Sequence, residues 1–103
     1  MAAYLIVRAV VPEADRTKFD QWYQDVHLPE ASAVFDAVSA WRGWSHDDPS
    51  MHVAFYEFPS LAKAMAIGDS AAMTNMRADF DRTWQNRISR SREFVEIAQH
   101  IKA

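Results

Sequence analysis

The segment that decides the fold spans residues 19–30 and reads FDQWYQDVHLPE. At about 100° per residue, a helix here gathers four side chains into one apolar stripe: Phe19, Trp22, Tyr23 and Val26. His27 lies one turn beyond Tyr23, at the edge of that stripe. Because Pro29 disfavours helical geometry at the residue before it, the sequence predicts a helix over about residues 13–27 with His27 in its last turn. There the helix dipole favours a cationic imidazolium, whereas burial lowers the pKa of the ring.

The composition is that of one ordinary folded domain covering residues 1–103. Of the 103 residues, 50% are hydrophobic and 24% are charged. The absence of cysteine excludes disulfides, cysteine-ligated zinc and a cysteine nucleophile, and we expect a reducing, cytoplasmic location. No apolar run approaches the ~20 residues of a membrane span, and the net charge of -3 argues against a nucleic-acid or anionic-membrane partner.

Alternation and turn residues place the remaining elements. The predicted order is strand, helix, strand, strand, helix, strand, over about residues 3–11, 13–27, 37–45, 51–58, 70–85 and 89–100. Residues 30–35 are ambiguous, and Asp69 or Ser70 can cap the second long helix. In a chain of this length the economical arrangement is an α+β fold of the ferredoxin-like type, with one antiparallel four-stranded sheet and both helices on one face.

The other face of that sheet is predicted to be open. It would carry Tyr4, Ile6, Arg8, Arg42, Trp44, His52 and Tyr56. Such a face is too aromatic to be comfortable in water, so we expect two copies to pack sheet to sheet as a homodimer. Arg8 and Arg42 would then pair across the dimer with Glu57 or Glu96, or alternatively hold an anionic ligand.

Two further groups of residues have simple structural interpretations. Met73, Met76, Phe80 and Trp84 recur at helical spacing and are predicted as core. Arg90 and Arg92 would share one face of the last strand with Glu96, as a solvated or ion-paired face.

The pair Trp22-Tyr23 followed by His27-Leu28-Pro29 resembles the dimeric α+β barrel superfamily, and within it the EthD-like branch. The resemblance implies a homodimer whose two sheets form a barrel, with a small-molecule pocket between sheet and helices in each subunit. Relatives include cofactor-free monooxygenases acting on polyketide-like aromatics, lactone isomerases and haem-degrading enzymes. The haem-degrading pattern uses an asparagine on the first strand, and residues 3–11 contain none.

His27 is the candidate catalytic residue, because a neutral imidazole at a pocket edge can take a proton from a phenol or an α-carbon. The alternative is a capping or packing histidine that hydrogen-bonds the backbone where the chain turns at Pro29. Trp22, Tyr23, Trp41 and Trp84 are candidates for binding a small hydrophobic or aromatic ligand, and the alternative for each is plain core packing. The hydroxyl of Tyr23 lies on the same side as His27 and could orient a substrate oxygen.

No metal or other cofactor is predicted. His46, Asp47, Asp48 and His52 are residue types that bind divalent ions, but Asp-Asp-Pro-Ser is ordinary turn chemistry. No phosphate-binding loop or dinucleotide fingerprint is present. Two functions follow: a cofactor-independent monooxygenase or isomerase with His27 as base, or a non-catalytic dimer that binds a small hydrophobic ligand or assists another enzyme.

Overall fold

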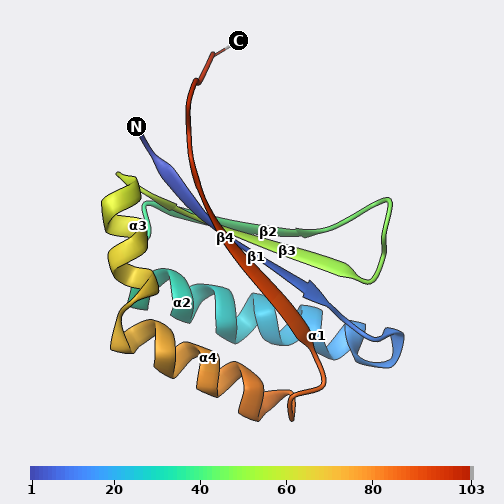
Figure 1. The fold of residues 1–103 in the computed structure, drawn as a ribbon. Coiled ribbons are helices and arrows are strands. Elements are labelled where there is room, and N and C mark those ends of the chain that lie inside the picture. Colours follow the sequence, from blue (N-terminus) through green and yellow to red (C-terminus); the bar gives the residue numbers. More distant parts are fainter. Residues whose placement is uncertain (103) are drawn as a thin grey trace.

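One antiparallel sheet forms a layer, and the helices all lie on one of its faces (Figure 1). The structure is a computed structural model and describes residues 1–102. The sheet has the order β2-β3-β1-β4, with bounds β1 (Ala3–Val10), β2 (Ser39–Trp44), β3 (Met51–Phe58) and β4 (Ser89–Glu96). The predicted ferredoxin-like α+β architecture is therefore confirmed. Within residues 1–102, no helix combines the length and apolar character needed to cross a membrane.

The first helical region is longer than predicted. It comprises a 3-10 turn (Glu13–Asp15), α1 (Arg16–Trp22), a π turn (Tyr23–His27) and α2 (Leu28–Phe35). The predicted end at His27 is wrong: Leu28 is helical, and its amide donates to the carbonyl of Tyr23, five residues back. Pro29 has no amide hydrogen and its ring crowds the preceding turn. The wider π turn gives that ring room, so the helix continues.

The second helical region matches the prediction more closely. It divides into α3 (Leu61–Gly68) and α4 (Ala71–Thr83), and the Ser70 hydroxyl caps α4 by accepting from the amide of Met73. The four predicted core residues are all buried: Met73, Met76, Phe80 and Trp84. Helix α4 therefore packs one continuous apolar stripe against the sheet.

The prediction for the open face of the sheet was half wrong. Tyr4, Ile6 and Arg8 do point away from the helices, but four residues lie on the helix-covered face instead: Arg42, Trp44, His52 and Tyr56. Leu5 pairs with Tyr56 across β1 and β3, and both are buried. Strand β3 has large apolar residues at both alternations, so its sequence did not indicate which side faces the helices.

Strand β4 ends at Glu96, earlier than the predicted residue 100, and the chain beyond it leaves the body (Figure 1). Arg90 lies on its helix-covered face and pairs with Asp81 of α4 rather than with Glu96. Arg8 on the open face pairs with Glu93 of the same chain, not with Glu57 or Glu96 of another. Arg90 and Arg8 thus pair with a carboxylate on a helix and one on a neighbouring strand, Asp81 and Glu93, rather than with the glutamates predicted from the sequence.

Candidate functional site

A pocket opens on the helix-covered side of the sheet, between strands β1, β3 and β4 and the helices. It encloses about 330 Å³, its open mouth included. Its walls are largely apolar, and its polar lining consists of Tyr23, His27, Tyr56, Arg77, Arg90 and Arg92. Side chains crowd it, so that beyond the mouth there is room for about one water molecule.

His27 lies at this pocket with its ring held by aromatic neighbours. It stacks on Trp22 at 4.6 Å between centroids, and Tyr23 and Phe80 approach it at 4.8 and 5.6 Å. Its side chain makes no capping hydrogen bond, so the capping alternative is wrong, whereas these aromatic contacts agree with the packing alternative. Burial, with a smaller contribution from the charge of Arg90, lowers the pKa of His27 to about 4. The imidazole is therefore neutral at pH 7 and able to accept a proton or a hydrogen bond.

Two tyrosine hydroxyls meet behind His27. The oxygens of Tyr23 and Tyr56 are 3.5 Å apart, and burial raises the pKa of both groups. Both phenols therefore stay protonated at neutral pH. They offer hydroxyl donors rather than bases to anything that enters the pocket.

Three guanidinium groups make the pocket positively charged. Arg90 donates to Asp81 at 2.7 Å and lies 3.9 Å above the Phe80 ring. Arg92 has a buried Nε with no hydrogen-bond partner among residues 1–102. Burial, followed by the like charges of Arg90 and Arg77, lowers the pKa of Arg92 to about 10. The sequence prediction missed this cluster, although the Arg-Ser-Arg alternation did place Arg90 and Arg92 on one face.

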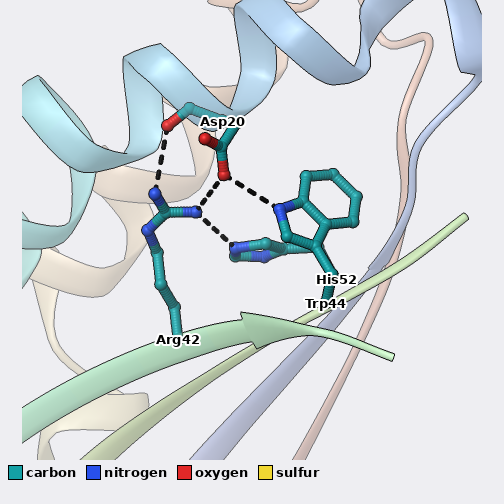
Figure 2. Close-up of polar contacts among 4 residues, drawn as sticks. All are labelled: Asp20, Arg42, Trp44 and His52. Atoms are coloured by element: carbon teal, nitrogen blue, oxygen red, sulfur yellow. Dashed lines mark hydrogen bonds and ion pairs between the residues drawn. The ribbon is translucent and has the colours of Figure 1, made fainter. Parts of the chain in front are cut away.

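A polar network of Asp20, Arg42, Trp44 and His52 joins helix α1 to strands β2 and β3 (Figure 2). Arg42 donates to the Asp20 carboxylate at 2.8 Å, and the Trp44 indole donates to the same oxygen at 2.9 Å. Arg42 also donates to Nε2 of His52 at 3.3 Å. Because a guanidinium only donates, Nε2 accepts and the imidazole proton lies on Nδ1, which has no partner among the described residues. Burial, followed by the charge of Arg42, lowers the pKa of His52 to about 4.

This network fixes Tyr23 from behind. The His52 ring is 4.4 Å from the Tyr23 ring, and the Arg42 guanidinium lies 5.6 Å from the Tyr23 centroid. His52 is fully buried, so the tyrosine rests on a surface that solvent does not reach. The arrangement holds the Tyr23 hydroxyl towards Tyr56 and the pocket.

The tryptophans predicted to bind ligand lie in two different places. Trp22 and Trp84 pack with Phe19 in the core, beside the pocket rather than in its lining. Trp41 is on the open face of the sheet, 44% exposed, where its ring contacts Tyr4 at 5.3 Å. Of the predicted ligand-binding residues, Tyr23 lines the pocket.

The metal-ligand types in the β2–β3 turn do not come together. His46 remains in the turn, whereas His52 is buried under the helices. Across residues 1–102, no three side chains of histidine, cysteine, aspartate or glutamate are grouped so that they could hold a metal ion.

No protein-family model matches the sequence, and no curated protein matches it significantly. Several solved structures do resemble its fold. A variant of SnoaB, a cofactor-independent oxygenase from Streptomyces nogalater, superimposes with a TM-score of 0.68 and 10% identity, over 99% of this chain and 98% of that one. The chain shares its fold.

Two further structures agree. A NIPSNAP family protein from Agrobacterium tumefaciens gives a TM-score of 0.70 at 8% identity, covering 94% of this chain and 87% of that one. An antibiotic biosynthesis monooxygenase gives a TM-score of 0.63 at 12% identity, covering 94% of this chain and 99% of that one. At such low identity the likeness establishes the ferredoxin-like α+β fold, and any activity must be inferred from the site itself.

Proposed function

We propose that this protein is a cofactor-independent, small-molecule-processing homodimer of the EthD-like kind, in which His27 removes a proton from a small aromatic or ketone-like compound. The observation that carries the proposal is the neutral His27 ring at a pocket that also presents hydroxyl donors and guanidinium groups. A base, a donor for an oxygen and positive charge are the parts that enolisation requires.

In the proposed step, a ring nitrogen of His27 takes the proton of an acidic C–H, and the electron pair of that bond forms an enolate. The enolate oxygen would accept from the hydroxyl of Tyr23 or Tyr56, with Arg90 and Arg92 stabilising the negative charge. A pKa of about 4 makes His27 a weak base in the empty pocket. The guanidinium charges that contribute to this low value also stabilise the enolate, and the enolate in turn stabilises the imidazolium. The carbanion is then reprotonated at another carbon, or is oxidised by dioxygen.

The proposed dimer would pack the open faces of two sheets together. Tyr4, Trp41 and Phe55 form an aromatic cluster there, with centroids 5.3 and 5.4 Å from Trp41. Covering a whole sheet face would bury roughly 1,200–2,000 Å² or more, the size of a stable interface. Sedimentation at micromolar concentration tests this part, and a monomer there contradicts it.

Proton abstraction can be measured without knowing the natural substrate. The probe is 2-tetralone, an aromatic ketone with an acidic benzylic carbon, and the readout is deuterium uptake at that carbon in D₂O, followed by NMR. Entry of this probe requires the flexible side chains of Met73 and Met76 and the exposed Arg77 to move aside. We expect exchange above background, reduced by about a hundredfold in His27→Gln. His46→Gln, in an exposed turn, is the matched control and should exchange as the wild type does. Unchanged exchange in His27→Gln would contradict the assignment of the base.

A non-catalytic dimer that binds a small hydrophobic ligand is the second candidate. The observation that favours it is the aromatic cluster of Tyr4, Trp41 and Phe55 on the open face, which supports a dimer whether or not His27 acts as a base. The crowding of the pocket limits ligand entry in both functions. This alternative predicts saturable ligand binding with no wild-type deuterium uptake above that of His27→Gln. The same samples therefore separate the two functions.

A further inference from the structure

The charge of the pocket differs in sign from that of the chain. The protein carries a formal net charge of -3, yet its pocket lining contains Arg77, Arg90 and Arg92 and no carboxylate. Asp81 offsets Arg90 by a direct ion pair at 2.7 Å. Two guanidinium charges remain, and clefts lined by charge of one sign concentrate ligands of the opposite sign.

Arg92 is the residue whose bonding is incomplete. Its Nε is buried without a partner within residues 1–102, and a buried donor that lacks a partner destabilises a fold. Within the described residues, neither Arg92 nor Arg77 takes part in an ion pair, whereas Arg82, Arg87 and Arg90 each have a carboxylate partner. Burial and two neighbouring guanidiniums lower the pKa of Arg92 by more than the charge of Asp81 raises it, so positive charge is in excess around this residue.

The rest of the lining limits which anion fits. Tyr23, His27 and Phe80 form an aromatic wall, and aliphatic and methionine side chains complete the surface. A fully hydrated inorganic ion gains little from such a wall, whereas a flat aromatic body does. A carboxylate matches the planar fork of a guanidinium, because both of its oxygens can accept parallel N–H bonds.

We propose that the ligand of this pocket is a small aromatic carboxylic acid, whose carboxylate is bound by Arg92 with Arg77 and whose ring lies against Tyr23, His27 and Phe80. As for 2-tetralone, the ring enters only when the side chains of Met73, Met76 and Arg77 move aside, because the closed pocket has room for about one water molecule. This inference rests on the proposed function in that both place the ligand in the same pocket. It adds the substrate class: the reacting carbon faces His27, and the carboxylate remains unreacted at the guanidiniums.

The test compares two probes of nearly equal shape by titration calorimetry, 2-naphthoate and its neutral counterpart 2-naphthamide. We expect the wild type to bind naphthoate at least tenfold more tightly, with the preference weakening as salt rises. Arg92→Met should lose about tenfold to a hundredfold in naphthoate affinity and leave naphthamide affinity unchanged. Arg77→Met, at an exposed position, should give a smaller loss of the same selectivity.

Arg82→Met is the matched control, because it removes the same charge from helix α4 at an exposed ion pair with Asp79. It should bind both probes as the wild type does. Equal wild-type affinity for the two probes would overturn the inference, as would unchanged naphthoate selectivity in both Arg92→Met and Arg77→Met. If Arg92→Met does not fold, Arg77→Met and the comparison of the two probes in the wild type still test whether the pocket binds a carboxylate.

The outcomes also separate this inference from the proposed function. Arginine-dependent naphthoate binding without deuterium uptake from 2-tetralone would support the ligand class and contradict the catalytic role of His27. Uptake from 2-tetralone without any preference for naphthoate would support the catalytic role and overturn the carboxylate site.

Discussion

The two faces of the sheet differ from the usual pattern, because charged groups lie on the covered face and an aromatic cluster lies on the open face. The helix-covered face holds Arg42, His52, Arg90 and Arg92 beside its apolar core, while the open face presents an aromatic cluster centred on Trp41. Polar groups are tolerated inside because helices supply carboxylates to several of them. Aromatics outside, by contrast, have nothing from this chain over them. The charge on the covered face therefore supports the proposed binding site, and the apolar surface of the open face supports the proposed contact between two copies.

The strongest test of the contrast is a truncation at the centre of the covered face. Phe19 is fully buried and contacts six aromatic rings, among them Tyr23, His52 and Phe80. Phe19→Ala should lower the free energy of unfolding by about 3–5 kcal/mol, because it leaves a cavity in a rigid cluster. Urea denaturation measures it. A loss below about 1 kcal/mol would mean that this cluster is not the core.

The covered face should also make the protein sensitive to mild acid. His27 and His52 both have pKa values of about 4 in the folded protein, below the ordinary 6.5. The unfolded chain therefore binds protons first as pH falls, and stability is lost between about pH 6.5 and 4. The loss is at most about 3 kcal/mol for fully buried His52 and less for the partly exposed His27.

Denaturation midpoints at about pH 7 and about pH 5 measure this effect. His52→Gln should flatten the dependence, because it removes the group that the folded state keeps neutral. The exposed His46→Gln should not. If stability depended on pH equally in the wild type and in His52→Gln, His52 would not be the group that the folded state keeps neutral.

The ion pair between Asp20 and Arg42 should contribute more to the free energy of unfolding than a fully exposed ion pair does. Asp20→Ala removes the acceptor of both Arg42 and Trp44 and leaves their donors beneath the helix. Asp20 itself is 47% exposed, so solvent reduces the loss to about 1–2 kcal/mol. Asp79→Ala, which breaks the exposed pair with Arg82, should cost below about 0.5 kcal/mol. Equal losses would show that the network contributes no more than a surface pair.

The smallest effect on the isolated subunit is expected on the open face. Trp41→Ser should change the stability of a dilute subunit by about 0.5–1 kcal/mol, since it loses contacts with Tyr4 and Phe55 only. If a second copy covers this face, wild-type stability will rise with protein concentration. The substitution should then weaken that dependence. A wild-type melting temperature independent of concentration would count against the proposed dimer.

Local patterns were sufficient to predict the element order, the Ser70 cap and the buried stripe of α4, because these depend on neighbours within a few residues. The side of the sheet on which Arg42 and Tyr56 lie depended on pairing between distant strands, which alternation in an almost wholly apolar β3 does not encode. His27 and Tyr23 were identified as pocket residues, whereas Arg92 was not. Its significance depends on which way the edge strand β4 faces, and the ion pair between Arg90 of β4 and Asp81 of α4 lies outside the alternation of β4 itself.

The π turn at residues 23–27 determines how many residues can separate the buried side chains on either side of it. Tyr23 and Ala31 are both buried, with 2% and 0% of their surfaces exposed. In an uninterrupted α-helix, residues eight positions apart would point about 80° away from each other. The π turn absorbs one residue and brings the two side chains onto one stripe. Losing a single residue among exposed positions 24–26 would keep this alignment, because side chains seven positions apart in an α-helix point within about 20° of each other, but it would remove the room that the π turn gives the Pro29 ring. Adding a residue would rotate Phe35 away from the core. This stretch should therefore accept many substitutions but no insertion, and a deletion only together with replacement of Pro29.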